Sequence, residues 1–569
     1  MYNQQQPRIP KMYLAQIEGR CSLQYTAEDA DRQQWLKEWV DPKQDGEPYQ
    51  HNEQNIQLGV DGSKFRIKVK FSGRIFSNCG QDSMLRPVLG KNGIPFIPGS
   101  SIKGLFKRVC NNEQKIRYCG DADSPGKLRF HGAYPVGNWT GRITVSANEN
   151  GQIVNRTCYL IEDLVHPQQK RQVETEDTTS ASALISFYQP TMIFEFSSAD
   201  KLIDWQEVQQ LLRQALRQGV GGKTSTGYGF AADVAPDCAQ SGSTLYQQAL
   251  HIELEGTGVS SKLLSKNPEF RPNIFKATLR GHVYRWLAGV CDNEQLVKNK
   301  ADELFGSTNA PGNVQIYWQQ FRKPKYDTKG RRANNPTYTT KGELHILSSP
   351  HDRTFTDSVL RFAFIMGGFG KSWRRIAHEL FYQEYIQQER KFDIGCHWKC
   401  FAPSDWVNIQ SAEELKSFLD SLQKLCCSYL NLNVSSVRPL ARWREAWHPD
   451  RVLVYSKVVT DSKIVRLFHN ENFKTTPAIG GRKPGDERPT SVSSVWHRML
   501  PLPNNQYLEI VTIFHGDRTP WMREEKNRLT GKLELKNQLP DFIKAIKEQF
   551  QEPNMLPTWG RELEQPSRR

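Results

Sequence analysis

The stretch GIPFIPGSSIKG at residues 93–104 decides how the first half of the chain folds. Pro98 and Gly99 allow a sharp turn, and Ser100 and Ser101 are favourable N-caps for a helix. In SIKGLFKRVC, which follows the turn, apolar residues recur at helical spacing. The stretch therefore predicts a loop that leads directly into an amphipathic helix.

This helix is basic between its apolar positions. Its start would present free backbone N–H groups, and Lys103, Lys107 and Arg108 add positive charge. A phosphate group would suit such a place, with Ser100 and Ser101 beside it. The alternative interpretation is an ordinary capped helix on a basic surface.

Strands surround the helix in a recognisable order. FRIKVKF at residues 65–71 alternates apolar and basic residues, which is typical of a strand with one wet face. KLRFHGAYP from Lys127, a hairpin around Asn150 and Gly151, and a strand at residues 184–197 come next. A helix over residues 205–218 and a final strand complete the order of a ferredoxin-like domain that carries insertions.

A glycine-rich loop, GVGGKTSTGYG at residues 219–229, follows the last helix. Its glycines would let the backbone approach a sugar-phosphate chain. The loop ends like a nucleotide-binding P-loop, but Arg217 stands where that motif needs its first glycine, and a helix precedes it instead of a strand. The predicted RNA-binding residues of this loop are Gly221, Gly222, Lys223, Thr224, Ser225 and Tyr228.

The same pattern restarts near Leu250. LHIELEG predicts a strand, residues 275–289 predict a helix with basic residues on one face, and residues 359–370 predict a strand before a second glycine-rich loop. A late strand from Tyr507 would complete this second domain. Its predicted RNA-binding residues are Lys276, Arg280, Arg285, Gly367, Gly368, Lys371, Arg374 and Arg375.

These patterns predict an α+β protein of two tandem ferredoxin-like, RRM-like domains. Residues 1–60 form an N-terminal extension. The first domain spans 61–240 and includes an insertion at about 139–180. The second spans 248–520 with a long insertion at about 377–490, and a helical tail covers 521–569.

The pairing of IPGSSIKGLFKR with GVGGKTSTGYG, at the two ends of one ferredoxin-like domain, resembles the RAMP superfamily of CRISPR proteins. The resemblance is strongest over residues 65–235, where it is to the backbone subunits that line guide RNA in type III complexes. It continues more weakly over 250–376 and 490–515. The tandem arrangement is most similar to the fused backbone subunits of type III-D variants, and the insertion at 139–180 matches the family's thumb-like hairpin.

The resemblance also implies a reaction. The family carries an aspartate shortly before an arginine in the loop after the first strand, and Asp82 and Arg86 occupy that place. The resemblance therefore implies that Asp82 cuts target RNA with a divalent ion, Mg²⁺ or Mn²⁺, while Arg86 or Lys103 stabilises the developing charge. The equivalent loop of the second domain has no such acid, so we expect that domain to bind and not to cut.

Two other functions stay open at this stage. One is a structural guide-RNA-binding subunit without catalysis. The other is a processing nuclease for guide precursor, for which Tyr228 is the one candidate general base near the glycine-rich loop. The expected partners are guide RNA, single-stranded target RNA and other effector subunits.

Composition agrees with these expectations. The formal net charge is +15, which favours a polyanionic partner, although a basic enzyme is the alternative. The sequence has no run of about 18 apolar residues, so no membrane span is predicted. Its eleven cysteines are irregularly spaced, which fits reduced thiols in the cytoplasm. Zinc ligation by Cys396 with Cys400, or by Cys110 and Cys119 with His131, is not expected, because neither group has paired short spacing.

Overall fold

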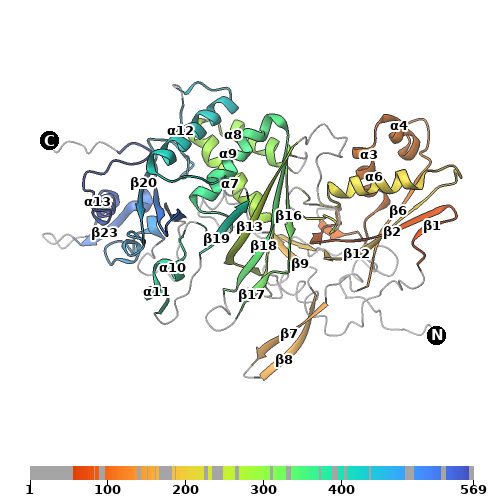
Figure 1. Cartoon of the computed structure of the whole chain (residues 1–569), viewed down its shortest axis with the longest axis horizontal. Helices are drawn as coiled ribbons and strands as arrows, with labels where there is room; N and C mark the ends of the chain where they lie inside the picture. The colour runs from red at the N-terminus through yellow and green to blue at the C-terminus, as the bar shows by residue number, and fades with distance from the viewer. Residues whose placement is uncertain are drawn as a thin grey trace.

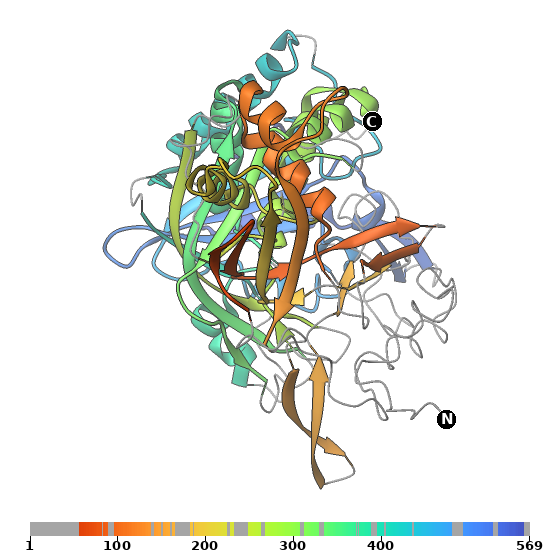
Figure 2. The ribbon, with the colours of Figure 1, turned by 90° about the vertical axis from the view of Figure 1, so that its right-hand side faces the viewer.

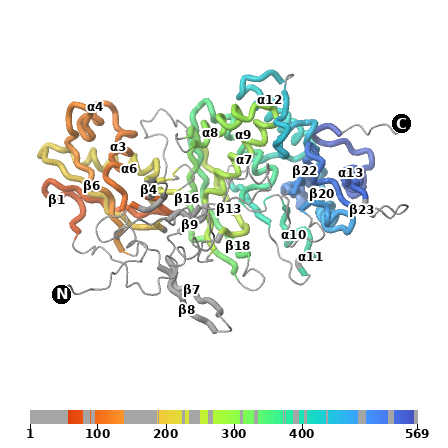
Figure 3. Tube along the Cα trace, turned by 180° about the vertical axis from the view of Figure 1, so that it is seen from behind, coloured from red at the N-terminus to blue at the C-terminus, as the bar shows by residue number. Residues whose placement is uncertain are grey.

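Three sheets lie in a row along the long axis of the molecule, in chain order (Figures 1 and 3). The computed structural model describes residues 56–81, 84–88, 96–137, 142–149, 152–159, 162–165, 182–185, 187–222, 224, 228–232, 248–262, 268–307, 312–328, 335–370, 373, 375–387, 395–402, 406–434, 437–480, 493–526 and 533–562. None of the helices among them is long and apolar enough to cross a membrane. The predicted N-terminal extension lies almost wholly outside this set.

The first domain has a four-stranded antiparallel sheet covered on one face by two helices. The sheet order is β1-β2-β12-β6, from β1 (Gly59–Asp61), β2 (Lys64–Lys70), β6 (Arg129–Val136) and β12 (Thr191–Ser197). The covering helices are α3 (Gly99–Val109) and α6 (Trp205–Arg217), with the short α4 (Asn112–Gln114) and η4 (Lys115–Cys119) beside α3. The final strand is reduced to a bridge between Phe71 and Ala231.

Two-stranded sheets accompany the main sheet of this domain. They pair β3 (Arg74–Ile75) with β11 (Phe187–Tyr188), β4 (Asn78–Gln81) with β5 (Met84–Pro87), β7 (Arg142–Glu149) with β8 (Gln152–Tyr159), and β9 (Glu162–Val165) with β10 (Ser182–Ile185). In the β7–β8 pair, Glu149 lies opposite Gln152, so a hairpin forms where the sequence predicts one. Asn150 and Gly151, which connect the two strands, lie outside the described residues. Figure 2 shows this hairpin projecting from the end of the molecule opposite α3 and α4.

The second domain repeats the ferredoxin-like topology. Its sheet order, β16-β18-β13-β19, places the first and third strands in the centre. The elements are β13 (Gln248–Val259), α7 (Asn273–Val290), α8 (Glu294–Phe305), β16 (Val314–Gln320), β18 (Thr337–Ser348), α9 (Pro350–Met366) and β19 (His397–Ala402), with β14 (Ser261–Lys262), β15 (Pro268–Glu269) and β17 (Lys325–Asp327) at the edges. The predicted α+β fold of two tandem ferredoxin-like domains is confirmed.

Two predicted details of this domain are wrong. Residues 359–366 continue helix α9 instead of forming a strand. The helix is buried on nearly all sides, so its apolar residues show no helical period in the sequence, and this is why a strand was predicted. The strand that completes the sheet is β19, which pairs with β13, and it lies inside the predicted insertion at 377–490. The strand from Tyr507 belongs to another sheet.

That third sheet has the order β20-β22-β21 and forms a C-terminal module. It comprises β20 (Val452–Val459), β21 (Val495–Pro501) and β22 (Tyr507–Phe514), preceded by α10 (His378–Phe381), α11 (Gln383–Gln387) and α12 (Ala412–Tyr429). Short 3-10 turns lie at Leu467–His469, Pro477–Ile479 and Thr519–Trp521. The predicted helical tail contains the hairpin β23 (Met522–Lys526) and β24 (Leu533–Asn537) as well as the expected helix α13 (Leu539–Gln549).

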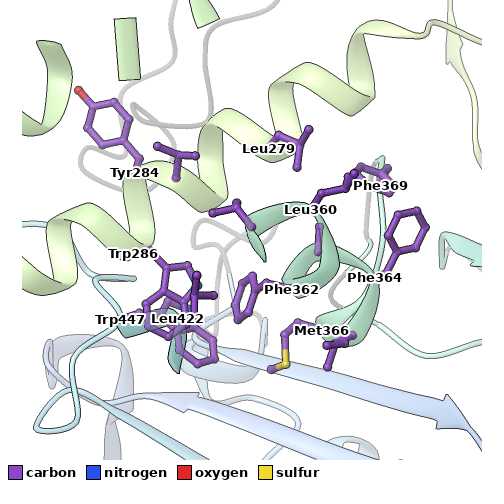
Figure 4. Packing of buried hydrophobic residues seen from close by; sticks show 14 of the residues in the cluster. Leu279, Tyr284, Trp286, Leu360, Phe362, Phe364, Met366, Phe369, Leu422 and Trp447 are labelled. Atoms are coloured by element: carbon purple, nitrogen blue, oxygen red, sulfur yellow. The ribbon is translucent and has the colours of Figure 1, made fainter. Parts of the chain in front are cut away.

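The largest core joins the second domain to the C-terminal sheet. Trp286 of α7 stacks on Trp447 with ring centroids 5.0 Å apart, and Phe362 of α9 meets the same indole edge-on at 4.8 Å. Figure 4 shows these side chains between the helices and the C-terminal strands. Successive side chains of β20 point to opposite faces of the C-terminal sheet. Val454 faces this core, whereas Tyr455 faces α13. Both faces of the C-terminal sheet are therefore covered.

A buried ion pair lies at the edge of this core. The Arg285 Nε atom is 2.6 Å from Glu445 Oε2, and both side chains are almost wholly removed from solvent. Replacing Glu445 by alanine leaves the Arg285 charge uncompensated, so we expect Glu445→Ala to lower the free energy of unfolding by about 3–5 kcal/mol. Chemical denaturation followed by tryptophan fluorescence measures this change.

The control is Lys416→Ala, which removes the exposed pair between Lys416 and Asp420 on α12. Exposed helical pairs contribute only about 0.3–0.5 kcal/mol. Equal destabilisation by the two substitutions would contradict the importance of the Arg285–Glu445 pair.

Candidate nucleic-acid interface

Strand β2 presents a basic face to solvent. Phe65 and Val69 point into the core, whereas Lys68 and Lys70 on the opposite face are exposed. Arg66 lies on that face too, and its Nε atom is 2.6 Å from Glu195 Oε2 of β12. The alternation in FRIKVKF predicts this face, and the predicted wet basic side is confirmed. Its lysines were not among the predicted RNA-binding residues.

The basic strand leads directly to the glycine-rich loop. Beyond β2, the Ser72 amide donates to Phe230 O at 3.2 Å, and the Ala232 amide donates to Lys70 O at 2.7 Å. The loop and the end of β2 therefore form one surface, which the sequence places about 160 residues apart.

Close backbone contacts hold this loop on β3. The Gly222 amide donates to Phe76 O at 2.7 Å, and the Gly229 amide donates to Arg74 O at 2.8 Å. At Gly221, φ is +82° and a Cβ atom would lie 2.3 Å from Phe76 O. At Gly229, φ is +76° and a Cβ atom would lie 2.0 Å from Val220 O. Glycine is required at both positions.

The loop exposes backbone at its tip. Gly221 and Gly222 are both exposed and Thr224 is half-buried. The Gly222 N–H group already donates to Phe76 O, so it is not available to an RNA strand. Such a strand would contact the exposed backbone atoms of the two glycines. Lys223 and Ser225 lie outside the described residues.

Tyr228 does not fit its predicted role. Its ring is 4% exposed and packs edge-on against Phe76 with centroids 5.2 Å apart. It supports the loop from beneath, because an aromatic ring under a glycine turn fills the space that the missing side chains leave. A buried phenol is also a poor candidate for the general base that a processing nuclease would need.

The start of α3 differs from the prediction in two ways. Its N-cap is Pro98, with no side-chain cap, so Ser100 and Ser101 lie in the first turn as exposed residues. Lys107 and Arg108 are exposed in the last turn, about 12 Å further along the axis, where they complement the helix dipole. Only Lys103, which is partly exposed, accompanies the helix start.

The second glycine-rich loop is buried. Gly367 and Gly368 are inaccessible, and a Cβ atom at Gly367 would lie 2.7 Å from the Trp373 side chain. Phe369 and Trp373 are packing residues with at most 5% exposure. Gly367 and Gly368, which were predicted to contact RNA, therefore offer no exposed backbone in this structure.

Two flanking cations of that loop, Lys371 and Arg374, lie outside the described residues. Arg375 is half-buried.

Helix α7 does not present a basic face either. Arg285 is fully buried against Glu445, and Arg280 pairs with Asp302 and donates to Ala301 O at 3.1 Å at the end of α8. Both were predicted to bind RNA; in the structure their guanidinium groups make these ion pairs within the chain. Lys276 is half-buried on the same helix.

The open face of the second sheet also differs in charge from that of the first. Glu253, Glu255 and Glu343 lie on it, with Lys341 2.7 Å from Glu253 Oε1. The exposed Lys399 of β19 lies opposite Glu255 on this face as well, so the face carries charges of both signs. Among the described residues, β2 has the denser row of exposed lysines, which favours a phosphate backbone on the first domain.

The predicted catalytic residues lie at the β4–β5 hairpin. Gln81 and Met84 are paired across it, which places Asp82 in the connection, outside the described residues. Arg86 is a residue of β5, and its side chain is likewise outside the described set.

The thiols named in the sequence analysis are mostly buried. Cys110, Cys119 and Cys396 are buried and Cys400 is partly so. Burial raises the pKa of Cys110 to about 12, so its thiol is protonated at neutral pH. His131 is exposed and hydrogen-bonds Ser197 instead.

Comparison with known families agrees with the first-domain geometry. Residues 81–232 match the family model of the RAMP superfamily. Over these residues the chain is similar to that superfamily. The matched segment includes the hairpin at Asp82, helix α3 and the glycine-rich loop, which are the features that carried the resemblance in the sequence. No curated protein matches the chain.

Among solved structures, the fold overlaps with Cmr1 from Pyrococcus furiosus at 14% identity and a TM-score of 0.34, over 55% of this chain and 99% of that one. Cmr6 from the same organism overlaps at 16% identity and a TM-score of 0.20, over 30% of this chain and 98% of that one. A chain of a type III-B Cmr-beta complex, bound to cognate target RNA and AMPPnP in the presence of ssDNA, overlaps at 10% identity and a TM-score of 0.28, over 53% of this chain and 98% of that one. Overlaps of this size do not assign a function.

The glycine contacts of the first domain lead to a prediction. Gly221→Ala places a Cβ atom against Phe76 O in a left-handed conformation, so we expect it to lower the free energy of unfolding by at least about 1–2 kcal/mol. The Gly222 amide should then exchange with solvent faster, because its bond to Phe76 O is displaced. Hydrogen exchange measured by mass spectrometry tests this.

Gly104→Ala is the matched control. A Cβ atom there meets no atom within 4 Å, and alanine favours a helix by about 1 kcal/mol over glycine. We expect this variant to be as stable as the wild type or more so. Unchanged exchange at Gly222 in Gly221→Ala would contradict the loop geometry.

Proposed function

We propose that this chain is a guide-RNA-binding backbone subunit of a type III CRISPR effector complex, of the tandem kind found in type III-D variants. The observation that carries the proposal is the exposed pair Gly221 and Gly222, in the segment that matches the RAMP superfamily, beside the basic face of β2. The chain would bind the ribose-phosphate backbone of the guide, single-stranded target RNA would pair with the guide, and neighbouring effector subunits would continue the assembly. Base pairing, not the protein, would supply sequence specificity.

The electrostatics support a division of labour between the domains. Lys68 and Lys70 can approach phosphates from β2, and the bare backbone of Gly221 and Gly222 lets a strand pass closely. The second domain lacks an exposed counterpart among its described residues, since its glycine loop and Arg285 are buried. Its proposed role is to hold the first domain in position within the assembly.

Removing the two lysines tests RNA binding. Lys68→Ala combined with Lys70→Ala should weaken binding of single-stranded RNA to the same degree for unrelated sequences. The slope of log affinity against log salt should decrease by about 1.4, because each phosphate contact contributes about 0.7 for a single strand. Fluorescence anisotropy over a salt series measures both quantities.

The control is Lys416→Ala combined with Lys544→Ala, which removes two exposed lysines from α12 and α13. This variant loses the same net charge far from β2. Equal loss of affinity in both double variants would show that only overall charge matters and would overturn the proposed interface.

Target cleavage is the second part of the proposal and rests on the family resemblance at Asp82. RNA carries its own nucleophile, the 2′-hydroxyl, which attacks the adjacent phosphate in line while the 5′-oxygen departs. A carboxylate at Asp82 would take the 2′-hydroxyl proton, and Arg86 would face the developing negative charge. A divalent ion, Mg²⁺ or Mn²⁺, would supply further charge stabilisation when bound.

We expect Asp82→Asn to leave target binding unchanged and to slow cleavage by about 10²–10⁴-fold, the usual contribution of a general base. The assay uses the assembled complex with a labelled target, and chelation of divalent ions should abolish cleavage in the wild type. Ser83→Ala next to it is the control and should cut normally. Undiminished cleavage by Asp82→Asn would leave the structural, non-catalytic subunit as the correct function.

A further inference from the structure

Three side chains that could ligate a metal ion meet on the open face of the second domain. His251 of β13 lies directly opposite His345 of β18 in the sheet, and Glu343 precedes His345 by two residues on the same face. Among the residues that the structure describes, this is the one group of three or more His, Cys, Asp or Glu side chains whose ligand atoms lie within 4.8 Å of one another.

The distances are close to those of a metal centre. Glu343 Oε2 is 3.0 Å from His345 Nε2 and 4.0 Å from His251 Nδ1. Ligand atoms about 2.0–2.1 Å from a tetrahedral zinc ion are about 3.4 Å from one another. The observed separations lie on both sides of this value, so small side-chain rotations would bring all three atoms onto one ion.

The three side chains differ in exposure. His345 is 2% exposed, with Tyr317 against its ring at 5.4 Å between centroids. The His251 and Glu343 side chains are 47% and 31% exposed, which leaves an entry path.

The ligand types select the metal. Two imidazole nitrogens and one carboxylate oxygen suit zinc-class transition metals, whereas Mg²⁺ and Ca²⁺ prefer oxygen ligands alone. Three protein ligands leave a fourth position for water or another group. This donor set contains no cysteine, so it is distinct from the thiol groups considered in the sequence.

We propose that His251, Glu343 and His345 form a binding site for a divalent transition-metal ion of the zinc class, with one coordination position open to solvent. The site lies on the face where Tyr317 contacts Phe230 of the first domain, with ring centroids 4.6 Å apart. An ion there would cross-link β13 to β18 and stiffen the sheet next to the junction between the domains. This site is independent of the proposed RNA-binding function.

The second coordination sphere sets the expected affinity. His345 Nε2 is also 3.2 Å from Gln319 Oε1, and its Nδ1 atom makes no hydrogen bond to the described residues. Metal on Nε2 places the ring proton on Nδ1 without an acceptor, and loss of such a partner usually weakens metal binding by about 10–100-fold. We therefore expect a dissociation constant nearer micromolar than picomolar.

Cobalt and zinc titrations of the full-length, metal-free protein test the proposal. Co²⁺ should produce visible d–d absorption bands that Zn²⁺ removes, with His251 and His345 as ligands. His251→Ala and Glu343→Gln should each lose one equivalent of Zn²⁺ or bind it at least tenfold more weakly. His251 is chosen because its exposed side chain can be removed without opening the core.

His131→Ala is the matched control, because His131 is an exposed strand histidine of the first domain. It should keep the full Zn²⁺ stoichiometry. Zn²⁺ should also raise the melting temperature of the wild type and of His131→Ala more than that of His251→Ala. Equal stoichiometry, affinity and thermal shift in wild type and His251→Ala would overturn the site, whichever other groups of the chain bind zinc.

Discussion

The buried ion pair between Arg74 and Glu269 is the contact on which the arrangement of the two domains depends. Arg74 lies on β3 and Glu269 on β15, and their Nη2 and Oε1 atoms are 2.5 Å apart with both side chains at most 9% exposed. The same arginine accepts the Gly229 amide on its carbonyl oxygen. One residue therefore positions the glycine-rich loop with its backbone and the second domain with its side chain.

Such a pair specifies geometry more than it adds stability. Two charges taken out of water recover their desolvation cost only when they meet each other closely. Glu269 is also 3.4 Å from the Arg271 Nε atom, so its carboxylate faces cations of both domains. The Tyr317–Phe230 contact lies on the same junction and adds apolar contact to this polar constraint.

The two domains share a topology but have diverged in what they expose. Each has a helix followed by a glycine-rich loop at the same place, α6 before Gly219 and α9 before Gly367. In the first domain the loop packs on a two-residue strand and its tip faces solvent. In the second, indole rings of Trp373 and Trp398 fill the equivalent space, so the glycines serve close packing. The same residue type thus has opposite uses in the two halves.

Local patterns could be predicted from the sequence, and long-range partners could not. The alternation of FRIKVKF, the Asn150-Gly151 hairpin and the α3 helix depend on residues within a few positions of one another. Arg285 looked like a surface cation because its partner, Glu445, is 160 residues away. The sequence of helix α9 shows no helical spacing of apolar residues, because the helix is buried on nearly all sides. His251 and His345 became neighbours only through the register of β13 with β18.

The distribution of core residues locates where the molecule can move. The second domain and the C-terminal sheet share one continuous core through Trp286, Trp447 and Trp559, so they form a single mechanical unit. The first domain has its own core and meets that unit through the Arg74–Glu269 pair and the Tyr317 contact. This small junction between two separately packed cores deforms more easily than either core, because packed interiors resist strain. A change in the angle between the two parts would therefore act on the glycine-rich loop, because Arg74 couples the domain orientation to the loop backbone.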